Sequence, residues 1–279
     1  MSECEFRVSP VSPVVGAEIS GVDLSEPLSP ETVSGLRQAL LDHGVIFFRD
    51  QDLTPARQMA LGEYFGEVAE YPFVRGLDDY PLVIPILKLA AETRNFGGIW
   101  HSDTAYLPEP PMGTVLHAKD LPPAGGDTLF ANMYAAYDAL SGGMKEMLTP
   151  LRALNSAAKQ SVSDTRQHRI DEAGKDTSNV TTESVHPVIR THPETGRKTL
   201  YVNRAHTVRF DGMTEAESAP LLSFLFDHQI REEFTCRFVW SPGAVAFWDN
   251  RCTQHYPVND YHGHKRLLHR ITLKGEVPS

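Results

Sequence analysis

A histidine and an aspartate stand two residues apart, at His101 and Asp103, within the segment Trp100-His-Ser-Asp-Thr-Ala-Tyr106. If this segment is extended, side chains two apart share a face, so an imidazole and a carboxylate would point into the same space. Such a pair supplies two of the three ligands of a 2-His-1-carboxylate triad, which holds Fe(II) and leaves coordination positions open. A surface histidine near an aspartate is usually only solvated. The metal hypothesis therefore needs a third ligand and anion-binding groups elsewhere in the chain.

A further histidine and two arginines near the end of the chain could complete such a site. His255 follows an apolar stretch that predicts a strand, and it is the candidate third ligand. Arg266 and Arg270 fall on another predicted strand, over residues 266–273, where alternate positions share one face. Two guanidinium groups that point into a barrel are costly unless they meet anions, and their planar forks suit a carboxylate or a sulfonate. The alternative is an exposed edge strand whose inward residues are Leu267, His269, Ile271 and Leu273.

Composition narrows the kinds of partner. The chain has 279 residues, of which 41% are hydrophobic, and we expect residues 1–279 to form a single domain with a sizeable core. The net charge of −10 argues against nucleic-acid and anionic-membrane partners. An anionic small ligand would therefore need a local cationic pocket, because the overall field opposes its approach.

Cysteine usage and hydropathy indicate the compartment. The three cysteines, Cys4, Cys236 and Cys252, include no C-x-x-C pair, which argues against a disulfide framework or a thiolate zinc site and suits a reducing cytoplasm. The first residues lack the basic and apolar regions of a signal peptide. No apolar run approaches the roughly 20 residues that a membrane span needs. We therefore expect a cytoplasmic protein with no membrane partner.

Start and stop signals predict the elements that must position these residues. Ser29, followed by proline, indicates a helix N-terminus and Gly44 the end of that helix. Thr54 repeats the start signal for a helix that reaches about residue 66, and Thr214 opens a capping box. Strands are expected within 5–20 and at 45–48, 114–118, 234–240, 244–248 and 266–273, with a hairpin over 185–204. This pattern indicates a β-rich domain decorated by helices.

Other stretches are less regular. Residues 67–100 are predicted to be irregular, and they lead into the His-x-Asp motif, where substrate groups tend to lie. Residues 131–154 are expected to be largely helical, with interruptions around 141–143 and at Pro150. The polar stretch 158–184 predicts a solvated loop or a lid.

Taken together, these segments resemble the Fe(II)/2-oxoglutarate-dependent taurine dioxygenase family, which includes phenoxyalkanoate and alkylsulfate dioxygenases. The similarity runs from about Gly16 to the end of the chain. The segments that carry it are Trp100-His-Ser-Asp103, Gly125-Gly-Asp-Thr-Leu129, His192-Pro-Glu-Thr-Gly196, Trp248-Asp-Asn-Arg-Cys-Thr-Gln-His255 and His264-Lys-Arg-Leu-Leu-His-Arg270. The resemblance implies a mainly β fold, the double-stranded β-helix or jelly-roll barrel, with α-helices packed outside.

The resemblance also implies ligands and a reaction. His101, Asp103 and His255 would bind Fe(II), while Thr128 and Arg266 would bind the far carboxylate of the cosubstrate 2-oxoglutarate. The remaining iron positions would take the other end of 2-oxoglutarate and O2. The implied reaction releases succinate and CO2 and hydroxylates a carbon of the substrate. A carbon that bears a sulfonate, sulfate or aryloxy group would then lose that group.

The implied substrate is a small anionic organic molecule. In the taurine enzyme the position that matches Arg270 holds the substrate's anion, although Arg270 could instead assist the cosubstrate. The body of the substrate would lie near Tyr71, Asn95, Tyr106 and His206, each of which could equally be a packing residue. Tyr71 stands where the taurine enzyme has a histidine, and His206 replaces an aromatic wall, which argues against taurine itself. Relatives form dimers or tetramers, so the resemblance implies a homo-oligomer.

Two other classes of protein stay open. A metal-binding barrel that has lost turnover would act as a ligand-binding module, but the intact set of metal ligands and both arginines argue against it. A zinc hydrolase could use the same two histidines and aspartate, but a carboxylate clamp at Arg266 would have no role there. Succinate production that depends on Fe(II) distinguishes the dioxygenase from both alternatives.

Overall fold

Two β-sheets form the centre of the molecule. A computed structural model describes residues 6–71, 73–159 and 180–279, so most of the predicted polar stretch 158–184 lies outside the described residues. The strands of the larger sheet are β1 Arg7–Pro10, β2 Ala17–Ser20, β3 Val45–Phe48, β4 Val68–Ala69, β5 Ile84–Lys88, β6 Gly113–Asp120, β14 Val245–Asp249 and β16 Arg266–Leu273. Those of the smaller sheet are β7 Thr128–Asn132, β13 Thr235–Phe238 and β15 Thr253–Pro257.

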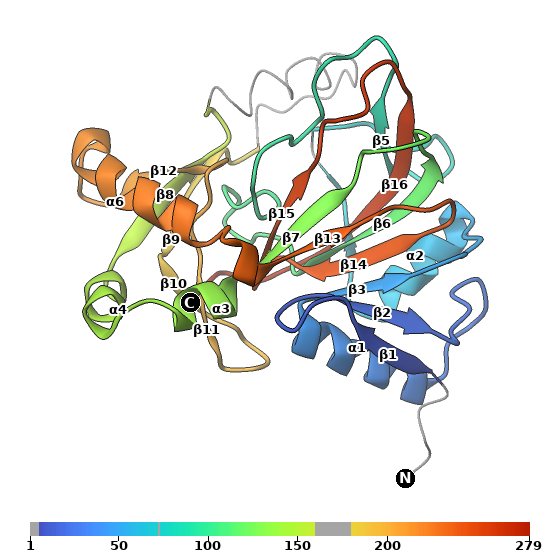
Figure 1. Cartoon of the computed structure of the whole chain (residues 1–279), viewed down its shortest axis with the longest axis horizontal. Helices are drawn as coiled ribbons and strands as arrows, with labels where there is room; N and C mark the ends of the chain where they lie inside the picture. The colour runs from blue at the N-terminus through green and yellow to red at the C-terminus, as the bar shows by residue number, and fades with distance from the viewer. Residues whose placement is uncertain (1–5, 72, 160–179) are drawn as a thin grey trace.

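The order of the strands gives the expected barrel. Within the described part of the chain, the larger sheet runs β1-β2-β3-β14-β6-β16-β4, and β5 also pairs with β16. The smaller sheet runs β13-β7-β15 (Figure 1). It packs against the larger sheet through an apolar cluster to which both sheets contribute side chains. The strands that are neighbours in a sheet are mostly far apart in the chain. The two sheets form the double-stranded β-helix that the sequence resemblance implied.

Both faces of the larger sheet are buried, and β3 shows how. Its side chains alternate, so Val45 and Phe47 face the smaller sheet while Ile46 and Phe48 face the other way. Phe47 stacks on Phe238 of β13 with ring centroids 4.0 Å apart. A strand that is apolar at every position is therefore explained by burial on two sides.

The first two helices begin and end where the sequence predicts. In α1, Pro30–His43, the Ser29 side chain accepts a hydrogen bond from a backbone N–H of the first turn, and Gly44 ends the helix at a φ of 71°. In α2, Pro55–Glu63, the Thr54 side chain caps the first turn in the same way. The predicted helix starts are therefore confirmed, and α2 ends slightly before the expected residue 66.

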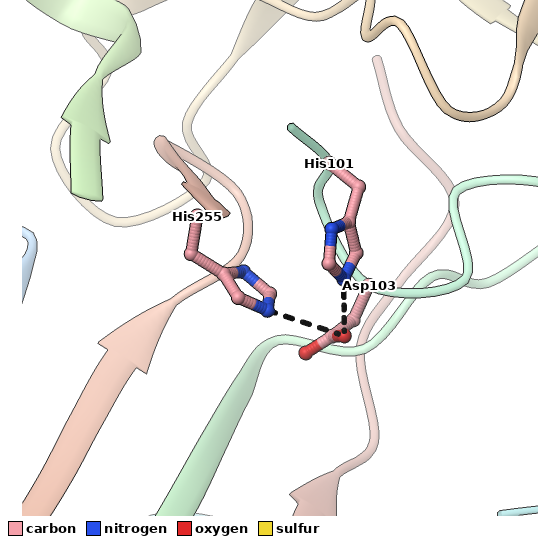
Figure 2. A group of neighbouring side chains, drawn as sticks. All are labelled: His101, Asp103 and His255. Carbon is pink, nitrogen blue, oxygen red and sulfur yellow. Dashed lines mark ion pairs between the residues drawn. The ribbon is translucent and has the colours of Figure 1, made fainter. Parts of the chain in front are cut away.

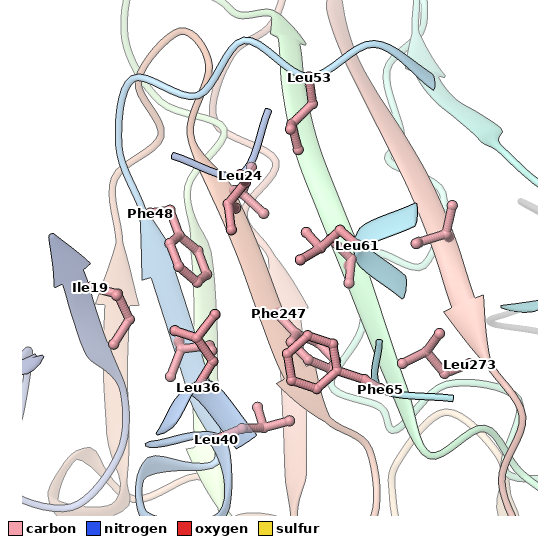
Figure 3. Packing of buried hydrophobic residues seen from close by; sticks show 14 of the residues in the cluster. Ile19, Leu24, Leu36, Leu40, Phe48, Leu53, Leu61, Phe65, Phe247 and Leu273 are labelled. Carbon is pink, nitrogen blue, oxygen red and sulfur yellow. The ribbon is translucent and has the colours of Figure 1, made fainter. Parts of the chain in front are cut away.

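These helices cover the outer face of the larger sheet. Leu36 and Leu40 of α1 and Leu61 of α2 point toward the sheet, where they meet Phe48 and Phe247 (Figure 3). All five side chains are buried, and this cluster lies on the opposite side of the sheet from the barrel interior. Burial of such side chains, roughly 1.5–3 kcal/mol each, holds the sheet in place behind the site.

The remaining elements pack at one end of the barrel. They are α3 Met133–Asp138, α4 Gly142–Leu148, β8 Arg152–Ser156, β9 Glu183–Pro187, β10 Ile189–Thr191, β11 Lys198–Leu200, β12 Thr207–Phe210, α6 Glu215–His228 and the 3-10 turn η1 Glu232–Phe234. They form two small sheets, β12-β8-β9 and β10-β11, which share an apolar cluster with the helices. The capping box predicted at Thr214 is confirmed at the start of α6.

Two predictions of local structure are wrong. Residues 152–156 form strand β8 rather than the end of a helix, because Pro150 follows α4 and cannot continue its hydrogen bonding. Residues 68–69 and 84–88 form β4 and β5 within the stretch predicted to be irregular. Pro85 within β5 weakens its strand signal, and the strand is defined by its pairing with β16. The predicted hairpin is confirmed only at β10 and β11, since β9 pairs with β8.

The position of β16 decides between the two readings of its arginines. β16 pairs with β6 on one side and with β5 and β4 on the other, so it is not an edge strand. Arg266 and Arg270 are 5% and 7% exposed, on the same face as the interior residue Leu268. The alternative of solvent-facing arginines is therefore wrong. Among the helices that the structure describes, none has the length and apolar character to cross a membrane.

Candidate metal and cosubstrate site

Backbone pairing brings two distant histidines together. His101 and His255 form an isolated antiparallel bridge, in which each backbone N–H donates to the other's carbonyl at 3.1 and 2.8 Å. The Ser102 hydroxyl adds a hydrogen bond of 3.0 Å to the carbonyl of Thr253. The two imidazole rings lie 4.1 Å apart, centroid to centroid. The smaller sheet thus fixes the position of the His-x-Asp segment relative to the third predicted ligand.

Asp103 completes the predicted group. Its Oδ1 lies 3.7 Å from Nε2 of His101 and 3.9 Å from Nε2 of His255 (Figure 2). The ligand atoms of all three residues lie within 4.8 Å of one another. The structure therefore brings together the three residues that the sequence singled out as metal ligands.

The protonation of this group suits a divalent metal. Nδ1 of His101 lies 2.6 Å from the carbonyl of Ile99, an acceptor, so Nδ1 carries the proton and Nε2 keeps its lone pair. Burial, aided by the neighbouring His101, holds the pKa of His255 well below its usual range. Burial opposes ionisation of Asp103, but Arg270 and the two imidazoles outweigh it and lower that pKa. Two neutral imidazoles and one carboxylate fit Fe(II).

A hydrogen-bond network orients the Asp103 carboxylate. The Thr114 hydroxyl donates to Oδ2 at 2.7 Å, which leaves Oδ1 facing the histidines. Asn250 donates to the Thr114 hydroxyl at 3.0 Å, and its own oxygen accepts from the Asp103 backbone N–H and from Trp248 Nε1. Sequence reasoning did not identify Thr114 and Asn250 as supports. Asn250 belongs to the family-like segment 248–255 that ends in His255, and this position was the sequence signal that could have identified it.

A second cluster resembles a metal site but is fully used for structure. His192, Asp249 and Cys252 also offer ligand atoms within 4.8 Å of one another. Nδ1 of His192 accepts backbone N–H groups, including that of Thr195 at 3.2 Å, so Nε2 carries the proton that it donates to Asp249 at 3.0 Å. Arg251 makes three further hydrogen bonds to the same carboxylate, two from its side chain and one from its backbone N–H. This network holds the turn that leads to His255.

One cavity, here called the Arg266 pocket, lies next to the two histidines. It is lined by Thr128, Tyr261 and Arg266, together with His101 and His255. Trp240 Nε1 donates to the Thr128 hydroxyl at 3.0 Å, so that hydroxyl can donate its own proton into the pocket. Buried Nε and Nη2 of Arg266 have no hydrogen-bond partner in the described part of the chain. Buried guanidinium donors that have no acceptor favour an anionic ligand.

The absence of a side chain at Gly126 leaves space for Arg266. A Cβ at Gly126 would lie 3.1 Å from Cδ of Arg266 and 3.2 Å from a ring carbon of Tyr261. Gly126 also has a φ of 72°, a conformation that side chains with a Cβ rarely adopt. The space that Arg266 needs thus explains the second glycine of the Gly125-Gly126 pair, whereas a Cβ at Gly125 would collide with the side chain of Asp260.

Arg270 lies between two cavities. It lines the Arg266 pocket and also a second cavity, here called the Tyr71 pocket, which is lined by Tyr71, Asp103 and His206 among others. Its Nη2 is 3.2 Å from Oδ1 of Asp103, and its Nε donates to the Thr272 hydroxyl at 3.2 Å. Its guanidinium carbon lies 5.0 Å from the ring centroid of Tyr71. Arg270 can therefore reach a ligand in either cavity.

The four predicted substrate residues do not lie together. Tyr71 and His206 line the Tyr71 pocket, whereas Asn95 lines the Arg266 pocket. The Asn95 amide donates to two backbone carbonyls and accepts from the Tyr261 hydroxyl, so it serves local structure. Tyr106 is fully buried and its ring lies 5.1 Å from that of His206. Tyr71 and His206 are thus better placed for direct contact with a substrate.

Comparison with known proteins gives consistent matches along the chain. The profile of the family described as taurine catabolism dioxygenase TauD, TfdA family matches residues 7–272. An alpha-ketoglutarate-dependent sulfate ester dioxygenase of Pseudomonas putida is 36% identical, over 98% of this chain and 91% of its own. A putative alpha-ketoglutarate-dependent taurine dioxygenase from Burkholderia xenovorans is similar in structure, with a TM-score of 0.83, 35% identity and coverage of 98% and 91%. AAD-2 in complex with Mn(II) and N-oxalylglycine has a TM-score of 0.79, 27% identity and 98% coverage of both chains.

Proposed function

Because the chain belongs to the taurine catabolism dioxygenase family of TauD and TfdA and is a 2-oxoglutarate-dependent dioxygenase, we propose that it hydroxylates a small anionic organic substrate. The single observation that carries the substrate class is the buried guanidinium of Arg270. It faces the Tyr71 pocket beside the candidate iron ligand Asp103. An anion is the ligand that such a group favours.

His101, Asp103 and His255 would hold the iron, and Arg266 with Thr128 would hold the far carboxylate of 2-oxoglutarate. When bound, Fe(II) supplies the activation of O2 that couples decarboxylation of 2-oxoglutarate to hydroxylation of the substrate. The protein positions both organic molecules. The Arg266 pocket orients the cosubstrate from one side of the histidines, while the Tyr71 pocket presents a substrate carbon from the other side.

The proposed substrate is an alkylsulfonate, an alkylsulfate or a phenoxyalkanoate, with its anion on Arg270. Its organic part would lie against Tyr71 and His206, which line the same cavity. Tyr106 would support His206, and Asn95 would support the neighbouring Arg266 pocket. Hydroxylation at the carbon that bears the sulfonate, sulfate or aryloxy group would release that group and leave a carbonyl compound.

The test is succinate release with Fe(II), 2-oxoglutarate and ascorbate across a panel of anions. The panel contains taurine, longer alkylsulfonates, alkylsulfates, both enantiomers of a phenoxypropionate, and a phosphonate. Strong coupling to one compound would identify the substrate class. Slow uncoupled turnover with every compound would contradict the proposed substrates. Absence of even uncoupled turnover in the iron-loaded protein would favour the silent ligand-binding barrel.

A homo-oligomer, dimer or tetramer, and a cytoplasmic location are proposals of the same kind. The first comes from the family resemblance and the second from the sparse cysteines, of which Cys236 and Cys252 are buried and unbridged. Light scattering on the purified protein tests the oligomer. A monomer across the concentration range of the assay would contradict it.

A further inference from the structure

The register of β5 against β16 places a third cation in the Arg266 pocket. In this antiparallel pair Lys88 lies directly opposite Arg266, and Ile84 lies opposite Arg270. Directly opposed residues project from the same face of a sheet, so Lys88 shares the interior face with both arginines. Lys88 lines the same pocket as Arg266 and Thr128. No residue of β5 was singled out in the sequence.

The ammonium group of Lys88 is buried and unmatched. The residue is 4% exposed, and its Nζ has no hydrogen-bond partner in the described residues. The Lys88 ammonium lies over the face of the Tyr261 ring, whose centroid is 4.2 Å from Nζ. A buried ammonium whose three donors make no hydrogen bond is costly, and a bound anion would remove that cost.

Tyr261 links Lys88 to Arg266. Its ring centroid lies 5.9 Å from the guanidinium carbon of Arg266, so the ring contacts both cations. The Tyr261 hydroxyl donates to the Asn95 side chain at 2.7 Å, which fixes the ring. The two cations are therefore held on a common support, with their unused donors in one cavity.

We propose that Lys88 is a second cationic ligand of the far carboxylate of 2-oxoglutarate, acting with Arg266 and Thr128. A carboxylate has two oxygens and about four acceptor positions, more than Arg266 and the Thr128 hydroxyl need to fill. Lys88 lines the pocket that contains those two residues and is absent from the lining of the Tyr71 pocket, in the part of the chain described. It therefore serves the cosubstrate and not the substrate. This inference rests on the proposed use of the Arg266 pocket by 2-oxoglutarate.

The experiment compares two ligands on three proteins by isothermal titration calorimetry. Wild type, Lys88→Met and Lys88→Arg are loaded with Mn(II), without oxygen-dependent turnover, and titrated with 2-oxoglutarate or 2-oxopentanoate. The second ligand keeps the keto acid but has a methyl group in place of the far carboxylate. Lys88→Met should weaken the binding of 2-oxoglutarate about tenfold or more, which is the effect of losing one charge-assisted hydrogen bond. The affinity for 2-oxopentanoate should stay unchanged. Lys88→Arg should keep most of the affinity for 2-oxoglutarate.

Two results would overturn the inference. Unchanged 2-oxoglutarate affinity in Lys88→Met would show that Lys88 does not bind the carboxylate, and equal weakening of both ligands would show a purely structural role. If Lys88→Met does not fold, as judged by thermal unfolding, Lys88→Gln gives the same comparison. Failure of wild type to bind 2-oxoglutarate at all would instead reject the cosubstrate pocket, and this inference with it.

Discussion

Nη2 of Arg270 lies 3.2 Å from Oδ1 of Asp103, the oxygen that also faces the imidazoles of His101 and His255. One carboxylate oxygen is thus shared between the candidate metal position and the candidate substrate anion site. The guanidinium and the two imidazoles keep the pKa of Asp103 below its usual range despite burial. An anion on Arg270 would consequently bind next to the iron, where a C–H bond can be attacked.

Replacement of Arg270 tests which ligand it binds. Arg270→Met should lower kcat/KM for the coupled substrate about 30-fold or more, because removal of one partner of a buried charge pair costs roughly 2 kcal/mol or more. The KM for the substrate should rise while uncoupled 2-oxoglutarate turnover persists. Steady-state succinate and product assays measure both, with Arg270→Lys as the matched control. A rise confined to the KM for 2-oxoglutarate would assign Arg270 to the cosubstrate.

Replacement of Asp103 tests the metal group. Asp103→Ala should abolish Fe(II)-dependent succinate formation, since the two histidines alone leave the metal without its carboxylate ligand. Metal content after desalting should fall together with activity. Asp23→Ala, which removes an exposed carboxylate distant from Asp103 in the sequence, is the control and should keep both its metal content and its activity. Turnover that survives in Asp103→Ala would reject the triad.

Thr114 offers a milder test of how the carboxylate is oriented. Thr114→Val keeps the shape but removes the hydrogen bond to Oδ2 of Asp103. Loss of such a support should weaken metal affinity about 10- to 100-fold. Competition with a metal-sensitive dye measures the affinity. Thr199→Val removes a buried hydroxyl that donates to the backbone carbonyls of Arg190 and Arg251, at 3.4 and 3.3 Å, and should leave metal binding unchanged. Equal losses in both variants would contradict an orienting role for Thr114.

Two buried histidines, His117 and His186, should make the free energy of unfolding sensitive to acid. Burial lowers the pKa of His117 and of His186 to about 4, against 6.5 for an ordinary histidine. Between these values the unfolded chain binds protons that the native chain does not, so the free energy of unfolding should fall as the pH drops from about 6.5 to about 4. Each histidine contributes at most about 3 kcal/mol to this fall. The contribution is fully present above pH 6.5.

Urea unfolding at a series of pH values measures this dependence. His186→Gln can keep a hydrogen bond to the Leu107 carbonyl that the histidine contacts at 2.9 Å, and it cannot be protonated. Its unfolding free energy should depend less on pH in that window than that of wild type. Parallel curves for wild type and His186→Gln would show that His186 does not bind its proton at a lowered pKa.

The chemistry of the candidate site was predictable because its residue types are specific. Few sites other than a metal centre with an anion-binding pocket combine a His-x-Asp motif, a distant histidine and two arginines in one strand. The resemblance to the family then implied which ligand each residue binds. Helix starts were predictable as well, because caps such as Ser29 and Thr54 act within one turn. These features depend on local spacing, which the sequence by itself determined.

Only the tertiary structure decided which residues share a cavity. Lys88 faces Arg266 through the pairing of strands that are almost 180 positions apart in the chain, and Pro85 weakened the local signal for that strand. Asn95 and Tyr71 were predicted to serve one ligand but line different cavities. Sheet register and packing decide which way a side chain points and how deeply it is buried. Both arise from contacts between segments that are distant in the sequence. The sequence therefore determined the chemistry, and the fold decided which ligand each charge can reach.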